Sequence, residues 1–234
     1  MKWTPAPLML ALDLDDEAKA LRIAQDLRGA VSAIKVGPRL IQKTGDRLVK
    51  DLAKWAPVFV DCKYHDIPST MEAAVRASFA AGATFVTVHA SAGPEALRRL
   101  AKVEAELNQK REFHLLAVTV LTSFSDDEKS LPANWKKQSV REHVLQLATQ
   151  VKAAGLTGLV CSPEELLILR DLDLNLVTPG IRLPGAESHD QRRVTGPAEA
   201  KGFGAWAMVV GRPILEANDP RQAAEQFLQA WQQA

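Results

Sequence analysis

The sequence predicts a single (β/α)₈ barrel that spans residues 1–234. Eight short apolar runs alternate with segments of helical periodicity from one end of the chain to the other. The runs are rich in Val, Leu and Ile with little polar alternation, which is typical of parallel strands covered on both faces. Such a barrel usually has about 250 residues. A doubly wound open sheet is the alternative, but it usually has fewer strands.

The predicted strands are the apolar runs themselves, at residues 8–14, 31–36, 57–61, 84–89, 113–121, 158–161, 175–178 and 207–210. The segments between them carry helix start and stop signals. Acids at 15–17 open the first helix, where the helix dipole favours negative charge. The other signals are prolines at 38, 68, 94 and 220, a helix over 71–81 that stops at Gly82, another over 139–154 that ends at Gly155, and a serine N-cap with proline at 162–163.

The composition excludes several classes of protein. Lys and Arg total 29 against 28 for Asp and Glu, so the basic surplus of a general nucleic-acid binder is missing. No stretch reaches the roughly 20 apolar residues of a membrane span, and the first residues lack the apolar core of a secretory signal. Cys62 and Cys161 lack metal-ligand spacing and are interpreted as reduced thiols in a cytoplasmic protein.

Charged residues stand at the carboxyl ends of the first three predicted strands. Asp13 ends the first strand, Lys35 ends the second, and Asp61 ends the third. Lys63 lies two residues after Asp61, so strand alternation directs both side chains to one face and Cys62 to the other. Because active sites of barrels lie at the carboxyl ends of the strands, these charges predict a polar active site.

Two further polar residues lie near this group. Asp66 follows Lys63 by three residues and can fold back beside it. His89 ends the fourth strand and could bind a divalent metal together with Asp61, but Lys63 between the two acids competes with a cation. We therefore interpret His89 as a packing residue and predict no metal site.

The last two strands predict a phosphate site. The loops after strands 7 and 8 commonly bind phosphate in these barrels. Gly211 allows close approach of the backbone to an anion, Arg212 adds a charged fork, and Pro213 can begin a helix. Arg182 follows the seventh strand. Residues 183–193 have the composition and length of a mobile lid, from which Gln191 could reach the phosphate.

These residues resemble the signatures of the orotidine 5′-phosphate decarboxylase family, most of all its bacterial branch. Residues 61–70 read D-C-K-Y-H-D-I-P-S-T and match D-x-K-x-x-D-I-P-x-T. Tyr64 stands where Phe or Leu is more usual, and Ser69 where Asn is common. Further matches, in family order, are A-L-D at 11–13, K-V-G at 35–37, V-H-A at 88–90, V-T-V-L-T-S at 118–123, T-P-G-I-R at 178–182, D-Q-R-R at 190–193 and V-G-R-P at 210–213.

The resemblance implies conversion of orotidine 5′-phosphate to UMP and CO₂, the last step of UMP synthesis, without a cofactor or metal. It implies that Lys63 protonates C6 of the pyrimidine and that Asp61 lies against the substrate carboxylate. It also implies a homodimer with shared active sites, in which Asp66 of the neighbouring subunit completes the charge array with Lys35.

The remaining implied roles concern substrate binding. Asp13 and Lys35 hold ribose hydroxyls, with Thr70 of the neighbour close by, and Thr122 lies beside the base. The 5′-phosphate or its closing loop is contacted by Arg182, Gln191, Gly211 and Arg212.

The chemistry of decarboxylation suits these residue types. Loss of CO₂ leaves a carbanion that a nearby ammonium stabilises and then protonates. Two carboxylates about 4 Å apart at an effective dielectric constant of about 20 repel each other by about 4 kcal/mol, and this repulsion disappears when one leaves as CO₂.

Two alternatives remain open from the sequence. A metal-dependent sugar-phosphate decarboxylase or aldolase shares the fold and the D-x-K-x-x-D pattern and uses a divalent ion to stabilise an enediolate. A non-catalytic nucleotide-binding barrel is the second, although it has no need of a lysine between two acids. An assay with orotidine 5′-phosphate, with and without EDTA, distinguishes them.

Overall fold

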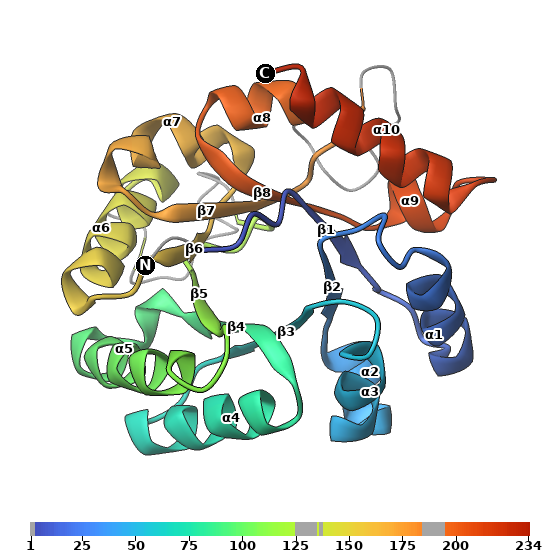
Figure 1. The fold of residues 1–234 in the computed structure, drawn as a ribbon. Helices are drawn as coiled ribbons and strands as arrows, with labels where there is room; N and C mark the ends of the chain where they lie inside the picture. Colours follow the sequence, from blue (N-terminus) through green and yellow to red (C-terminus); the bar gives the residue numbers. More distant parts are fainter. Residues whose placement is uncertain (1–2, 125–134, 136–137, 184–194) are drawn as a thin grey trace.

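The computed structural model describes residues 3–124, 135, 138–183 and 195–234. Within them, eight parallel strands form a closed barrel in the order β1 to β8, with β8 pairing back onto β1 (Figure 1). The predicted fold class is confirmed, and the open doubly wound sheet is wrong. The strands are β1 (Leu8–Ala11), β2 (Ala33–Val36), β3 (Val58–Tyr64), β4 (Ala83–His89), β5 (His114–Val118), β6 (Gly158–Val160), β7 (Asn175–Pro179) and β8 (Ala205–Val210).

Each predicted strand is present, but several end at a different residue. β1 ends at Ala11 and β5 at Val118, earlier than predicted, whereas β3 continues to Tyr64. The apolar run after β5 misled the prediction because Val120 and Leu121 line a cavity and do not continue the strand. The chain leaves β1 before Asp13, whose half-exposed carboxylate then lies at the barrel rim.

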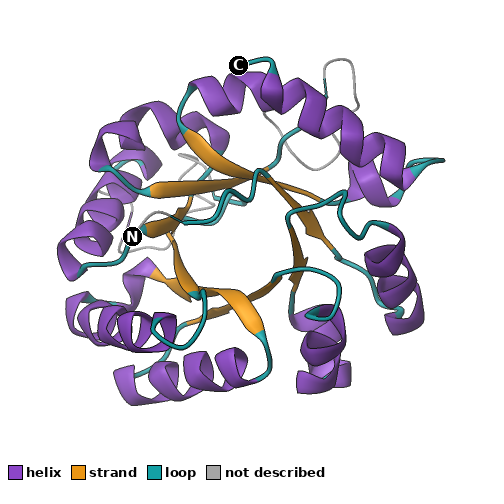
Figure 2. Ribbon diagram, in the orientation of Figure 1, coloured by secondary structure: helices purple, strands orange, loops and turns teal. Residues whose placement is uncertain are grey.

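Helices cover the outside of the barrel (Figure 2). They are α1 (Glu17–Asp26), α2 (Pro38–Thr44), α3 (Asp46–Leu52), α4 (Pro68–Ala80), α5 (Pro94–Asn108), α6 (Val140–Ala154), α7 (Leu166–Leu169), α8 (Pro197–Gly202), α9 (Arg212–Leu215) and α10 (Pro220–Gln232), with 3₁₀ turns η1 (Ala90–Ala92), η3 (Pro163–Glu165) and η4 (Arg170–Leu172). The predicted starts are confirmed except at 162–163, where the signal opens the 3₁₀ turn η3 and α7 begins only at Leu166. Helices α3 and α8 were not predicted.

Local chemistry explains the helix ends. The Asp16 side chain accepts a hydrogen bond from the Lys19 N–H and so caps α1. Ser139 and Glu142 form a reciprocal capping box at the start of α6. That helix ends at Gly155, whose φ of 93° lies in the left-handed region that glycine adopts without strain. No helix among the described residues is long and apolar enough to cross a membrane.

The amino-terminal end of the barrel is closed by aromatic side chains. Trp3 stacks on His114 with ring centroids 4.0 Å apart and meets Trp206 edge-on at 5.1 Å. A Cβ atom on Gly158 would overlap both the Trp3 ring and the Leu115 carbonyl oxygen, so this packing requires glycine at the start of β6. The barrel interior is therefore filled at this end.

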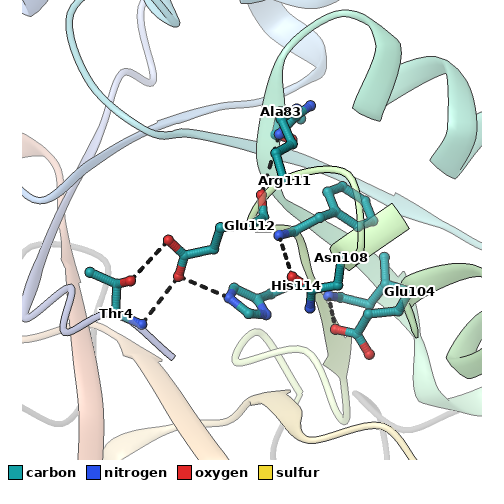
Figure 3. A network of polar contacts seen from close by, with 9 residues as sticks. Thr4, Ala83, Glu104, Asn108, Arg111, Glu112 and His114 are labelled. Atoms are coloured by element: carbon teal, nitrogen blue, oxygen red, sulfur yellow. Dashed lines mark hydrogen bonds and ion pairs between the residues drawn. The ribbon is translucent and has the colours of Figure 1, made fainter. Parts of the chain in front are cut away.

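A network of hydrogen bonds at the same end of the barrel connects the amino-terminal segment, α5 and the starts of β4 and β5 (Figure 3). Thr4 donates hydrogen bonds to the Glu112 carboxylate through both its N–H and its hydroxyl, and His114 lies 3.1 Å from that carboxylate. The buried Glu104 on α5 accepts a hydrogen bond of 2.7 Å from the Leu115 N–H of β5. Arg111 donates to the Ala83 carbonyl at the start of β4. With this end fixed, the opposite end is left for the functional site.

Candidate active site

A cavity of about 450 Å³ opens at the carboxyl ends of the strands. Its polar lining residues are Asp13, Lys35, Arg39, Asp61, Lys63, Thr122, Arg182 and Arg212. Its apolar wall consists of Ala11, Phe59, Val118, Val120, Leu121, Val160, Cys161, Val177, Pro179 and Val209. An organic ring with charged substituents at both ends fits a cavity of this size and composition.

The four charged residues predicted from the first three strands form a continuous array of alternating sign. The Lys35 Nζ lies 3.0 Å from an Asp13 oxygen and 3.2 Å from Oδ2 of Asp61. The other Asp61 oxygen, Oδ1, lies 2.9 Å from the Lys63 Nζ. The prediction that these side chains lie together is thereby confirmed.

The electrostatics of the array follow from burial and pairing. Lys35 and Asp61 are only 11% and 12% exposed, so desolvation opposes both charges. Burial alone would lower the pKa of Lys35, but Asp61 and Asp13 outweigh it and raise that pKa. Burial would likewise raise the pKa of Asp61, but Lys35 and Lys63 hold it below its usual value. Both groups therefore stay charged.

A bulge in β3 presents Asp61 and Lys63 to the cavity. Val60 of β3 pairs with Val86 of β4, but the next paired residue is Tyr64, opposite Val88. Three residues of β3 thus face Thr87 alone, and Lys63 has a φ of 48° in the left-handed region. For a residue other than glycine this conformation costs about 1–2 kcal/mol. The Lys63 side chain, 36% exposed, is the more open of the two lysines.

Two cationic residues, Arg182 and Arg212, line the cavity after β7 and β8, the two strands after which the sequence predicts an anion site. Arg182 is buried, and no described residue hydrogen-bonds to its Nε. Burial, and next the charge of Arg212, lower the pKa of Arg182. Because the two guanidinium groups repel each other, an anion bound near both of them would be favourable. Gly211 packs closely on the last residue of β1, because a Cβ there would lie 3.4 Å from Ala11.

Two predicted residues that the structure describes, Asp66 and Thr70, do not line the cavity. Asp66 does not fold back beside Lys63: its carboxylate accepts a hydrogen bond of 2.7 Å from the Ile67 N–H instead. Thr70 lies on the exposed side of the first turn of α4. Gln191 and most of the predicted lid lie outside the described residues. Thr122 lies in the cavity wall.

His89 packs against another histidine. Its ring lies 5.1 Å from that of His65, and burial, followed by the charges of His65 and Lys63, lowers its pKa. In the described part of the chain, no group of three or more His, Cys, Asp and Glu side chains is placed to hold a metal ion. The two lysines occupy the positions beside Asp61 that a cation would need.

Sequence reasoning missed two residues of this site. Arg39 lines the cavity and donates to the Asp13 carbonyl oxygen at 3.2 Å. Thr87 contacts both Lys63 and Asp61. Its signal was a hydroxyl inside an otherwise apolar run, V-T-V, but the bulge that makes it important leaves no spacing pattern in the sequence.

Comparison with known proteins agrees with this geometry. Residues 6–227 match the model of the orotidine 5′-phosphate decarboxylase / HUMPS family. Orotidine 5′-phosphate decarboxylase from Alcanivorax borkumensis is 38% identical over 96% of this chain and 97% of its own. The enzyme of that name from Parasynechococcus marenigrum is 43% identical over 92% and 90%.

A solved structure extends the likeness to three dimensions. The crystal structure of orotidine 5′-phosphate decarboxylase from Lactobacillus acidophilus superimposes with a TM-score of 0.82 at 34% identity, covering 97% of this chain and 99% of that one. The sequence match and the shared barrel span nearly the same residues, and the charged signature at 61–70 lies within them. The chain therefore belongs to the orotidine 5′-phosphate decarboxylase / HUMPS family.

Proposed function

We propose that this enzyme decarboxylates orotidine 5′-phosphate to UMP and CO₂, the last step of de novo UMP synthesis. The observation that carries the proposal is one apolar-walled cavity lined by both the Asp13–Lys35–Asp61–Lys63 array and two arginines, Arg182 and Arg212. The charge array can bind the reacting carboxylate and stabilise the carbanion it leaves, and the positive charges of the arginines can bind the phosphate. The names of the relatives support the same reaction.

Lys63 is the proton donor in this proposal. The bond between C6 and the carboxylate breaks, CO₂ leaves, and the electron pair stays on C6. The Lys63 ammonium stabilises that charge and then transfers a proton from Nζ to C6, after which solvent restores the lysine. Asp61 lies against the substrate carboxylate, so their repulsion is relieved as CO₂ departs. Lys35 keeps Asp61 ionised through its contact of 3.2 Å.

The other roles divide between the two ends of the substrate. Asp13 and Lys35 bind ribose hydroxyls, and Thr122 contacts the base. Arg182, Gln191, Gly211 and Arg212 bind the phosphate. Binding energy from this remote group can close the site and orient the reacting ring.

The active enzyme is a homodimer with shared sites in this proposal. Asp66 and Thr70 lie outside the cavity of their own chain, and Ile67 between them is 65% exposed. An exposed isoleucine beside two signature polar residues suits a contact with a second copy. There, Asp66 would complete the array of the neighbouring site. The free thiols of Cys62 and Cys161 fit the cytoplasmic location that we also propose.

We expect the reaction to need no cofactor or metal. The test is an ultraviolet assay of purified enzyme with orotidine 5′-phosphate, before and after dialysis against EDTA. Equal turnover in both samples supports the proposal. Activity lost to EDTA and restored by Mg²⁺ would favour the metal-dependent sugar-phosphate chemistry, and binding of UMP without any turnover would favour a nucleotide-binding barrel.

A further inference from the structure

Thr87 lies opposite the β3 bulge and fills the hydrogen-bonding gap that the bulge creates. Three residues of β3 face this single residue of β4, so the Lys63 N–H has no backbone partner across the ladder. The Thr87 hydroxyl accepts a hydrogen bond of 2.9 Å from that N–H. A buried N–H without such a partner is costly, so the hydroxyl supports the left-handed backbone of Lys63.

The same hydroxyl also reaches the neighbouring carboxylate. It donates its proton to Oδ1 of Asp61 at 3.0 Å, the oxygen that the Lys63 Nζ contacts at 2.9 Å. The contacts form a closed ring that runs from the Lys63 N–H through Thr87 and Asp61 to the Lys63 ammonium. Thr87 itself is 0% exposed and is not part of the cavity wall.

We propose that Thr87 is a positioning residue that fixes the Lys63 ammonium and the Asp61 carboxylate in their reactive arrangement. The inference rests on the proposed function, in which these two groups act on the substrate. Thr87 acts through them: its hydroxyl determines where the lysine backbone turns and which way the carboxylate faces. Loss of the hydroxyl should thus disturb the chemical step and leave the ribose and phosphate contacts in place.

Two substitutions separate the hydroxyl from the shape of the side chain. Thr87→Val keeps the volume and branching but removes the hydroxyl, whereas Thr87→Ser keeps the hydroxyl and removes a methyl group. The control is Thr119→Val, which removes another buried threonine hydroxyl, one that donates to the Val160 carbonyl at 3.2 Å and does not contact the array. If Thr87→Val melts too low for assay, Thr87→Ala replaces it under the same criteria.

The measurements are kcat and KM for orotidine 5′-phosphate, the Kd of UMP by calorimetry, and the melting temperature. We expect Thr87→Val to lower kcat about 10- to 100-fold while KM and the UMP Kd change less than about 3-fold, because misplacement of a reacting group affects the chemical step. Thr87→Ser and Thr119→Val should each keep kcat within about 3-fold of the wild type.

Two results would overturn the inference while the proposed function stands. One is an unchanged kcat in Thr87→Val beside an active wild type, and the other is a Thr87→Ser variant as slow as Thr87→Val, which would assign the effect to packing. A wild-type enzyme that does not turn over orotidine 5′-phosphate at all would instead overturn the proposed function, and this inference with it.

Discussion

Lys63, which carries the ammonium group, has a backbone conformation that residues other than glycine rarely adopt. Its φ of 48° is supported by the bulge in β3 and by the hydroxyl of Thr87, and the ammonium contacts Asp61. Alanine at this position would meet similar backbone strain without the charge. The substitution therefore removes the chemistry and leaves the local fold largely as it is.

We predict that Lys63→Ala lowers kcat by at least about 10⁴-fold, because it removes both the proton donor and a cation beside the developing carbanion. The melting temperature should stay close to that of the wild type. Lys54→Ala is the matched control, since Lys54 is an exposed lysine whose partner is Asp51. Steady-state kinetics and calorimetry check both variants, and a Lys63→Ala enzyme with near-normal kcat would contradict the proposed mechanism.

Single residues also show where sequence reasoning succeeds. Asp13, Lys35, Asp61 and Lys63 were predicted to meet because each stands at or just after the end of an apolar run, and parallel strands bring such ends to one rim. Tyr64 was noted as a departure from the family signature. In the structure its hydroxyl lies 2.9 Å from the Ser78 hydroxyl, so the extra polar atom has a partner.

At the scale of elements, the joint between α5 and β5 contains a buried acid. Glu104 accepts the Leu115 N–H, and burial raises the pKa of its carboxyl to about 7, from 4.5. Between pH 4.5 and about 7, the Glu104 carboxyl is therefore protonated in the folded protein but ionised in the unfolded chain. This group contributes more to stability as the pH falls through that range, and it destabilises the fold above it.

We predict that Glu104→Gln stabilises the protein at pH 8 and that the difference shrinks as the pH falls toward 5. The amide oxygen can still accept the Leu115 N–H but carries no charge, and the gain at pH 8 is at most about 3 kcal/mol. Denaturant unfolding at several pH values measures it.

The control is Glu106→Gln on the same helix. Glu106 is exposed and Arg76 lowers its pKa, so its removal should give no gain at pH 8. Equal effects of the two variants would contradict the assignment to burial of Glu104. Burial also raises the pKa of Glu165 to about 7, so both acids affect the pH dependence of wild-type stability. The effect of Glu104 is therefore read from the difference between the Glu104→Gln and Glu106→Gln variants.

The elements also show what the sequence could not reveal. Apolar periodicity locates β5 but cannot tell a strand residue from one that lines a cavity, so Val120 and Leu121 were assigned to the strand. The role of Thr87 depends on a shift of register between β3 and β4. The closure of the barrel by Trp3 depends on packing between residues far apart in the chain, among them His114 and Trp206.

At the scale of the whole molecule, the proposed site draws on both ends of the chain and on a second subunit. β1 to β3 supply the charge array and the loops after β7 and β8 supply the arginines. In the proposed dimer, the loop with Asp66 serves the neighbouring site. If each active site is built from two subunits, two inactivating substitutions on different subunits can fall together in one site and leave the other site intact.

We predict that Lys63→Ala and Asp66→Asn complement each other when their subunits exchange. Each mixed dimer would hold one site with both defects and one with neither. Random pairing of equal amounts should therefore restore about a quarter of wild-type activity. Exchange is verified with differently tagged subunits. Verified exchange without recovered activity would mean that each site uses the Asp66 of its own chain.

Closure of the barrel has a consequence for biosynthesis. β1 pairs on one side with β2, which is made early, and on the other with β8, one of the last elements to be made. At a translation rate of about 5–20 residues per second, the wait for β8 lasts roughly 10 to 40 seconds.

During that interval the edge of Leu8–Ala11 stays open, although all four of its residues are buried in the finished protein. Open apolar edges pair readily with other chains. We therefore expect the newly made protein to need its first strand shielded, by the ribosome or by chaperones that bind apolar segments, until its last strand arrives.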